Sequence, residues 1–465
     1  MLANQLTTLL ADETTGVTDA LKLVSDVDAI LVTGLARPDA DREVTLAALT
    51  AAFTATPLGD RVAESIEKIN AGSLADEHVV ALAAARAALL GAVHDALISA
   101  MDGAIGRARA VSPPPAVTEG GAATAALRGA ARSWLAELAV TGLLGVDEAS
   151  LSGANQIIEG LFAEPEGRRL AVLLDGFTAE LHGCAPIAAM EEIPARRWAD
   201  MWTRAELLAR DNIPTTENEV LSGRLLILGV ELFEHPTMFG AQVHGVCEPA
   251  DGSAARLVRI TVTAPKVDTI VGPAMWVLLA DHPNLLAALA QGRAVKLTDA
   301  TVTPLGDLAW NDVAVSLGEE VDPIAAARMC LSEVVAPAAS PADRHPVAIA
   351  EPVFIESYKA VKGEPARFDL GGAVLDLDIA HLPTAGPMTA KHVTASTACV
   401  GLLRWDAGTW RLRPLAVLTP VKRQPTVIHN GEWAAGPTDP KVAKALERND
   451  SVRVLRERAG RLLRT

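Results

Sequence analysis

The sequence predicts a multidomain α+β protein with an all-α N-terminal half of helical bundles and a β-rich C-terminal half with helical insertions. Small barrels are one option for the β-rich part. Before residue 215, almost every segment is rich in Ala and Leu at helical spacing. After it come short β-branched runs punctuated by Gly, Pro and Asp, which is typical of strands and turns. Because half of the residues are hydrophobic, the chain can bury sizeable cores.

The length of 465 residues corresponds to about three domains. We expect a helical bundle over 1–110, a Pro/Gly linker over 111–121 and a second helical region over 122–215. Two β-rich modules follow, the first over 216–340 with a helical insertion and the second over 341–465 with a basic C-terminal helix. The linker VSPPPAVTEGG is the clearest boundary, because consecutive prolines stop a helix and favour polyproline II.

Within the first bundle, Leu6, Leu9 and Leu10 have the spacing of one helix face. Ser73 and Asp76 resemble a capping box at the start of the next long apolar segment. Independent folding of residues 1–110 is the expectation that follows from these self-contained patterns.

The apolar segment from 74 to 107 is the longest in the chain, and Gly91 and Gly103 either divide it or permit close helix packing. Arg86 and His94 interrupt it, so we expect no membrane span. The N-terminus also lacks the pattern of a signal peptide. The sequence therefore predicts a cytoplasmic protein without membrane contact.

The second helical region divides at its caps and prolines, with Asp147 as an N-cap and Pro165 and Pro194 in first turns. The expected helices are 122–142, 147–162, 165–183 and 194–211.

Period-2 alternation and turn residues place the strands of the C-terminal half. Asp251-Gly252, Gly371-Gly372 and Asp406-Ala407-Gly408 are the turn signals. The expected strand segments are 241–248, 255–264, 294–303, 347–358, 366–379 and 399–418. The expected helices are an insertion that starts at Pro273 and Pro283, a helix from Asp322-Pro323 to about Val335, and a basic helix over 440–464.

The formal charge of −16 disfavours non-specific binding to nucleic acid or anionic membrane by the chain as a whole. The charge is unevenly distributed. Residues 1–100 carry 6 basic and 14 acidic side chains, whereas residues 401–465 carry 13 basic and 6 acidic ones. This opposition favours docking of the C-terminus on an acidic surface, either a partner's or that of the N-terminal bundle.

The best candidate for chemistry is Asp376-Leu-Asp378-Ile-Ala-His381, with Asp369 across the Gly-Gly turn. Two carboxylates and an imidazole can bind a divalent metal or form an acid/base pair. The competing interpretation is a strand whose polar face lies in water, since the carboxylates alternate with apolar residues. We favour this interpretation, so we expect no catalytic residue, no cofactor and no stoichiometric metal.

Two further groups combine histidine with cysteine: His235, His244 and Cys247, and His182 with Cys184. Neither has the spacing of a known ligand set, and adjacency in sequence does not give the geometry of a nucleophile and its base. The four cysteines form no CxxC pair, which indicates reduced thiols. The chain also lacks the common phosphate-loop, dinucleotide, serine-hydrolase and zinc-protease motifs.

The C-terminal hairpin combines Arg404, Arg411 and Arg413 with Trp405 and Trp410, a combination that single-strand binders use. The alternative is a hairpin whose tryptophans pack inward, which the alternation with Leu403 and Leu412 favours. The candidate partner-binding residues are Arg404, Arg411, Arg413, Arg453 and Arg456.

Several stretches between Arg197 and Tyr358 resemble uncharacterised actinobacterial proteins encoded beside MoxR-type AAA ATPases, von Willebrand factor A proteins and SWIM zinc-finger proteins. These stretches are RWADMWTRAELL, SGRLLILGVELFEH, VRITVTAPKVDTIVGPAMW, GDLAW and DRHPVAIAEP. The SWIM metal-binding signature is absent, so the resemblance carries over no zinc site, and it carries no catalytic residue. It implies a cytoplasmic accessory component of an ATPase-linked system.

The sequence leaves three functions open. The first is a non-catalytic scaffold or adaptor of a cytoplasmic bacterial complex, with protein partners that include an AAA ATPase system. The second is a nucleic-acid-binding module that uses the basic C-terminus. The third is an enzyme with a carboxylate/His centre near 369–381. We place the adaptor first.

Overall fold

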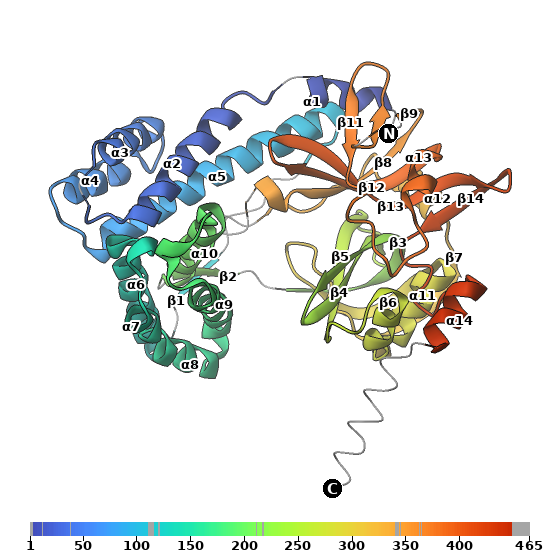
Figure 1. Ribbon diagram of the computed structural model, residues 1–465. Coiled ribbons are helices and arrows are strands. Elements are labelled where there is room, and N and C mark those ends of the chain that lie inside the picture. Colours follow the sequence, from blue (N-terminus) through green and yellow to red (C-terminus); the bar gives the residue numbers. More distant parts are fainter. Residues whose placement is uncertain are drawn as a thin grey trace, which may run out of the picture.

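The computed structural model of the chain confirms the predicted α+β architecture, with 47% helix and 25% strand (Figure 1). Helices dominate the N-terminal half, and the strands of residues 219–429 form two sheets. The structure describes residues 3–448, except 12, 38, 110–115, 120, 211, 216–217, 340–343, 345, 362 and 364.

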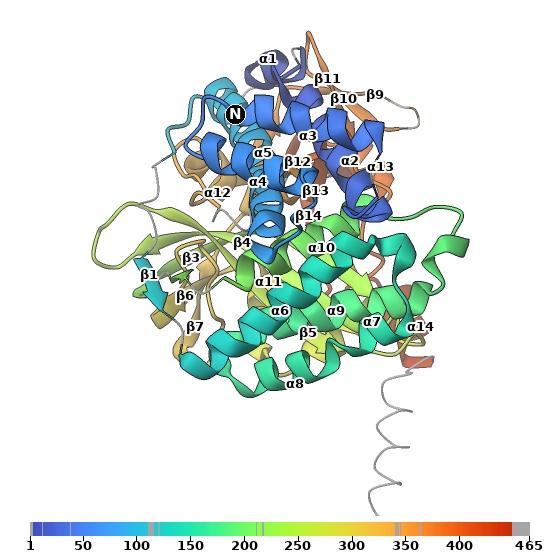
Figure 2. The same ribbon diagram turned by 90° about the vertical axis from the view of Figure 1, so that its left-hand side faces the viewer.

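The helical lobe is built from two runs of helices that share one continuous core (Figure 2). The first run is α2 (Val17–Thr33), α3 (Ala40–Phe53), α4 (Gly59–Asn70) and α5 (Asp76–Ile105). The second run is α6 (Ala122–Thr141), α7 (Glu148–Ser152), α8 (Asn155–Ala163), α9 (Arg168–Cys184) and α10 (Ala195–Leu208). The buried side chains of this core extend from Val24 to Ala209, so helices from both sides of the predicted linker contribute to it.

The caps of these helices were predicted in part. Asp147 caps α7 by accepting a hydrogen bond from Ser150 N, but the helix expected to reach 162 breaks at Gly153. Pro165 opens a short 3₁₀ turn before α9, and Pro194 is the N-cap of α10. The capping box expected near residue 73 is wrong, because α5 begins after Ala75 without a side-chain cap.

Helix α5 joins the two halves of the molecule, and its glycines do not divide it. Its first half, from Val79 to Leu90, lies in the core of the helical lobe. Its second half, from Val93 to Ile105, packs beneath the second β-sheet together with Leu6 and Leu9 of the N-terminal turns η1 (Ala3–Leu6) and α1 (Thr7–Ala11). Residues 1–110 therefore contribute to two cores rather than to one bundle.

Part of the predicted linker is a strand. β1 (Ala116–Glu119) pairs antiparallel with β2 (Asn212–Thr215), while the three prolines lie outside the described residues. The two ends of the second helical run thus lie side by side. The linker divides the sequence but not the core, and independent folding of residues 1–110 stays a prediction.

The first sheet lies within the range 216–340 and is antiparallel throughout. Its strand order is β5-β4-β3-β6-β7, with β3 (Glu219–His235), β4 (Met238–Pro249), β5 (Arg256–Pro265), β6 (Arg293–Val302) and β7 (Val315–Glu320). The expected insertion forms the 3₁₀ helix η5 (Gly272–Leu279) and α11 (Pro283–Gln291), and Asp322 caps α12 (Pro323–Cys330).

Small barrels were one option that the sequence offered for the β-rich part, and this sheet curls in that direction. Single bridges join Arg259 of β5 to Asp307 and Val302 of β6 to Leu308, so one short segment connects both sides of the sheet. Gly306 adopts a φ of +80°, and a Cβ there would lie 3.0 Å from Leu257 O. Glycine therefore permits the close approach of this segment to β5.

The second sheet lies within the range 341–465. Its order is β8-β12-β13-β11-β10-β9 with β14 on β13, from β8 (Ala350–Glu356), β9 (Lys359–Val361), β10 (Arg367–Asp369), β11 (Val374–Leu377), β12 (Ala398–Asp406), β13 (Thr409–Val421) and β14 (Gln424–His429). Both expected turns join paired strands, and Trp405 lies opposite Trp410. The short α13 (Ala390–Thr394) precedes β12, and the terminal helix α14 (Pro440–Arg448) is described only for the first part of the expected 440–464.

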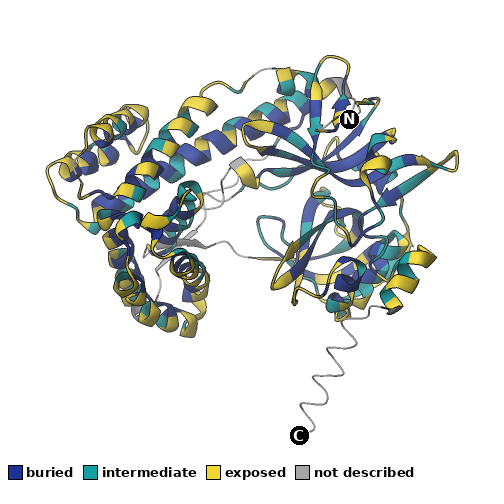
Figure 3. Cartoon of the chain, in the orientation of Figure 1, coloured by how far each residue is buried: buried dark blue, intermediate teal, exposed yellow. Residues whose placement is uncertain are grey.

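The β-rich half is a stack of layers, and Figure 3 shows which of their residues are buried. The second sheet packs on α5 with one face and on the first sheet and α12 with the other. The far face of the first sheet is covered by η5 and α11. The sheets meet closely, because a Cβ at Gly229 of β3 would lie 2.7 Å from Leu415 Cβ of β13.

By length and composition α5 is also apolar enough to cross a membrane, which the expectation based on uninterrupted runs missed. Of its most apolar window, 61% is buried inside the fold. Packing on two cores accounts for this composition without a bilayer.

A buried ion pair fixes α5 within the helical lobe. Arg86 Nε donates to Asp28 Oδ1 of α2 at 2.6 Å, and Arg86 Nη1 donates to Thr203 Oγ1 of α10 at 3.2 Å. Both charged side chains are almost fully inaccessible to solvent. Arg196 also pairs with Asp28, at 3.4 Å, but it is partly exposed and its contact is longer. Removal of Arg86 therefore leaves a poorly compensated charge in the apolar core, which is costly.

We predict that Arg86→Ala lowers the free energy of unfolding by about 3–5 kcal/mol, measured by urea denaturation of the full chain. The control is Lys22→Ala, which removes a solvent-exposed pair with Asp26 on helix α2 and should change the free energy of unfolding far less. The double variant Arg86→Met with Asp28→Leu should recover most of the loss, since it leaves no buried charge. Equal effects of Arg86→Ala and Lys22→Ala would contradict this account.

Glu206 of α10 is another buried ionisable side chain in this lobe. Neither of its carboxyl oxygens has a hydrogen-bond partner among the described residues. Burial and, less strongly, Asp76 raise the pKa of this carboxyl to about 8, although Arg132 opposes them. The folded protein therefore holds a proton that the unfolded chain loses near pH 4. The stability that the protonated Glu206 contributes is fully present below about pH 4 and is lost as the pH rises through about 8.

We predict that Glu206→Gln flattens the decline in stability between pH 6 and pH 8, a decline of up to about 1.4 kcal/mol per pH unit for one group. Urea denaturation at several pH values measures it. Glu137→Gln, at an exposed position of α6, should leave the slope unchanged. A parent-like slope in Glu206→Gln would mean that this carboxyl is already ionised in the folded protein.

Candidate functional site

The structure does not bring the predicted carboxylates and histidine into one centre. Asp369 accepts a hydrogen bond from Gly371 N at 2.8 Å and so stabilises the Gly-Gly turn. Asp376 pairs with Arg367 on the neighbouring strand at 2.9 Å. Asp378 contacts His381 Nδ1 through one oxygen and binds a different arginine through the other. Among the described residues, no group of three or more His, Cys, Asp and Glu is placed to hold a metal ion.

Asp378 belongs to a charge network that joins the two sheets. Arg413 of β13 donates to Asp378 Oδ2 from Nε at 2.8 Å and from Nη2 at 2.6 Å. Burial alone would raise the pKa of Asp378, but hydrogen bonds from His381 and Arg413 and the charge of Arg413 hold it below its usual value. Arg413 and Arg404 both also bind Glu231 of the first sheet. Two candidate partner-binding arginines are therefore engaged inside the protein.

The remaining arginine candidates are distributed differently. Arg411 lies on β13 and is half-buried, and its Nε has no hydrogen-bond partner. Trp405 and Trp410, its neighbours in the hairpin, are buried in the core beneath the second sheet, as their alternation with leucines predicted. Arg453 and Arg456 lie outside the described residues.

The histidine and cysteine groups also separate. His235 is exposed in the β3–β4 turn, where its Nδ1 lies 3.0 Å from Thr237 Oγ1. Cys247 lies in the core of the first sheet, and burial raises the pKa of its thiol to about 11. Residues at odd and even positions of a strand point to opposite faces, so His244 faces away from Cys247. His182 and Cys184 lie in the last turn of α9.

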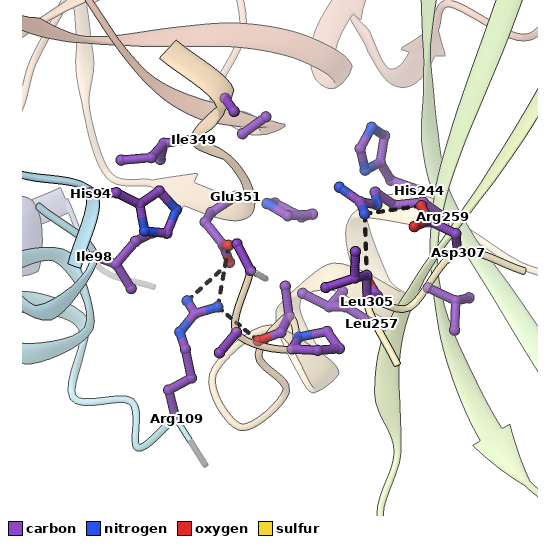
Figure 4. A pocket seen from close by; sticks show the side chains of 18 of the residues that line it. His94, Ile98, Arg109, His244, Leu257, Arg259, Leu305, Asp307, Ile349 and Glu351 are labelled. Atoms are coloured by element: carbon purple, nitrogen blue, oxygen red, sulfur yellow. Dashed lines mark hydrogen bonds and ion pairs between the residues drawn. The ribbon is translucent and has the colours of Figure 1, made fainter. Parts of the chain in front are cut away.

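One cavity of the β-rich half lies where α5, the first sheet and residues 336–339 and 348–352 meet (Figure 4). Its volume is about 450 Å³, within the range of small-molecule sites. Its wall is partly apolar, and its charged and polar side chains come from elements far apart in sequence. These side chains are His94, Asp95, Arg109, Arg169, His244, Arg259, Asp307 and Glu351.

On the α5 side, Arg109 is held by several acceptors. Its Nε and Nη2 donate to Asp102 at 2.9 and 3.1 Å, and its Nη1 donates to Ala336 O at 2.7 Å. Glu351 is a further partner at 3.3 Å. Burial would lower the pKa of Arg109, but its hydrogen bonds to Asp102 and the charge of Glu351 raise it. Arg109 therefore anchors the segment after α5 to the second sheet and has little capacity left for a ligand.

On the opposite side, Arg259 of β5 donates to Leu305 O at 3.3 Å and pairs with Asp307 at 2.9 Å (Figure 4). His244 lies opposite Arg259 in the β4–β5 register. It is only 1% exposed, and its Nε2 has no hydrogen-bond partner. Burial, with the charges of Arg259 and Arg404, lowers the pKa of this imidazole to about 3, so it is neutral at physiological pH.

Sequence reasoning missed this cavity, although it singled out His94 and His244 and placed Arg259 in the expected strand 255–264. His94 stood out as a polar interruption of an apolar helix, and it lines the cavity beside Asp95. His244 stood out beside Cys247, but as part of a different group. Arg259 matched a solvent-facing strand position, and nothing in the sequence joined it to Asp307. The usable signal in the sequence was the presence of polar residues within otherwise apolar elements. No signal indicated that these residues converge on one cavity.

Comparisons with known proteins add no assignment for this chain. No protein-family model matches it, and neither the curated proteins nor the solved structures contain a significant match. The functional proposals therefore rest on the geometry of the described residues, on the charge distribution of the sequence and on the resemblance noted above.

We predict that Glu231→Ala destabilises the full chain by about 1–3 kcal/mol, between the values for exposed and buried pairs, because it leaves Arg404 and Arg413 without their shared carboxylate. Thermal unfolding followed by tryptophan fluorescence measures the change. Glu248→Ala is the matched control, since it removes an exposed pair with Arg224 within the first sheet and should cost about 1 kcal/mol or less. If both variants behave alike, the network between the sheets contributes nothing beyond a surface pair.

Proposed function

We propose that the protein is a non-catalytic scaffold or adaptor of a cytoplasmic bacterial complex, linked to a MoxR-type ATPase system. One observation carries the proposal: the charged side chains with several hydrogen bonds or ion pairs each connect separate parts of the molecule. Arg86 joins α2, α5 and α10, Arg109 joins the end of α5 to the second sheet, and Glu231 joins the two sheets. Such joints fix the relative positions of the exposed surfaces, which is what an adaptor requires.

The charge distribution supports protein partners as the binding targets. The first hundred residues have a net charge of −8 and the last 65 a net charge of +7. Opposite charge on separate parts of one chain steers complementary partners and suppresses wrong ones. The proposed contact is the basic segment 440–464 on an acidic protein surface.

A nucleic-acid-binding module that uses the same basic segment is the second candidate, and the five arginines between 453 and 464 favour it. Stacking on the C-terminal hairpin does not add to this candidate, since Trp405 and Trp410 are buried and sequence-tolerant binding needs accessible aromatic faces. We place the enzyme third, because only Asp378 and His381 of its carboxylate/His centre contact each other, while Asp376 pairs with Arg367 and Asp369 stabilises a turn.

We predict that affinity purification of the tagged full chain from its native host recovers a protein partner, and that Arg453→Glu with Arg456→Glu removes it. Mass spectrometry identifies the partner. Lys422→Glu with Arg423→Glu is the matched control, because it makes the same charge change in the exposed β13–β14 turn and should retain the partner.

The same variants distinguish the nucleic-acid-binding candidate from the adaptor. Labelled oligonucleotides are titrated at low and at near-physiological salt, where a phosphate binder loses affinity with a slope of about −0.7 per neutralised phosphate for single strands. Sub-micromolar binding at physiological salt that the first double variant abolishes would overturn the adaptor proposal in favour of nucleic acid.

A further inference from the structure

The cavity between α5 and the first sheet has no part in the adaptor proposal, yet it is built in a way that calls for an occupant. It encloses about 450 Å³ at a junction between separate parts of the chain, the position in which small-molecule sites preferentially form. Its apolar wall includes Ile98 of α5, Leu257 of β5 and Pro337. Figure 4 shows Ile98 of α5 and Leu257 of β5 on opposite sides of the cavity.

His244 supplies the independent observation. A buried polar atom without a partner lowers stability, and few native groups are left in this state. Nε2 of His244 is such an atom, and its side chain lines the cavity. The neutral imidazole can donate one hydrogen bond from Nε2 when its other nitrogen carries no proton.

The charges around His244 determine what kind of group fits there. Arg259 and Arg404 are the charged residues that lower the pKa of this imidazole, and both are cationic. The carboxylates that line the cavity, Asp95, Asp307 and Glu351, are each paired with an arginine. Within the described part of the chain Arg259 has one carboxylate partner, Asp307, and both members of that pair are about two-fifths exposed. The guanidinium therefore keeps donors accessible from the cavity. Arg109, by contrast, is surrounded by its own acceptors.

We propose that this cavity binds a small organic oxyanion, with its carboxylate or phosphate group between Arg259 and His244 Nε2 and its apolar body against Ile98, Leu257 and Pro337. Arg259 donates charge-assisted hydrogen bonds to the oxyanion, which are roughly twice as strong as neutral ones. His244 donates the bond that its buried position leaves unmade. The apolar wall adds burial of the ligand body, so charge and hydrophobicity are both required.

The test is isothermal titration calorimetry on the full chain with four probes: phenyl phosphate, benzoate, inorganic phosphate and benzyl alcohol. At least one of the two aromatic anions should bind, and the comparison between them identifies the headgroup. Inorganic phosphate lacks the apolar body and benzyl alcohol lacks the charge, so each should bind at least about tenfold more weakly.

Arg259→Gln should weaken the aromatic anion by about tenfold or more, as expected for the loss of a charge-assisted hydrogen bond. Arg256→Gln is the matched control. It lies on the same strand β5 and pairs with exposed Glu219, away from the cavity, so affinity should change less than about twofold. His244→Leu should also weaken binding. If that variant does not fold, the two arginine variants still decide the question.

The absence of binding by either aromatic anion at millimolar concentration would overturn the proposal and leave the cavity to water. Equal losses in Arg259→Gln and Arg256→Gln would overturn it too, because they would indicate attraction by overall charge. The assay uses the purified chain without partners, so its result is independent of whether the adaptor proposal holds.

Discussion

The shared helix α5 is the constraint on which the rest of this structure depends. One half of it completes the core of the helical lobe, and the other half completes the core beneath the second sheet. A helix of 30 residues spans about 45 Å, so it can serve two cores only if it stays rigid and correctly placed. The buried Arg86–Asp28 pair supplies the placement, since it fixes the register of α5 against α2. An apolar contact alone would tolerate small shifts along the helix axis, whereas hydrogen-bonded charges do not.

The same principle recurs where the sheets meet. Glu231 receives two arginines from the second sheet, and Asn430 Nδ2 donates to backbone oxygens of both Val230 and Pro414 at 3.3 Å. Apolar packing around Phe354 and Val400 supplies the burial, and these polar contacts determine the orientation. Polar groups at apolar interfaces thus set geometry, which is consistent with a molecule that presents several surfaces in fixed relation.

The cavity is a consequence of that arrangement. Its walls come from α5, from the β4–β5 pair and from the segment that leads into the second sheet, so it exists only when all of these parts are docked. A ligand bound there would contact each of them and would stabilise the docked form by mass action.

The sequence by itself determined the division into helical and β-rich halves, most of the elements and the inward packing of Trp405 and Trp410. Periodicity, caps and turn residues act over a few neighbouring positions, and such local signals are written in the chain. Tertiary structure alone decided that α5 is shared between two cores, that Arg404 and Arg413 meet Glu231, and that Arg259 and His244 line one cavity. His244 and Arg259 are 15 positions apart in the sequence, and Glu231 and Arg413 are 182 positions apart. Their partners are selected by packing of whole layers, for which no local pattern provides a signal.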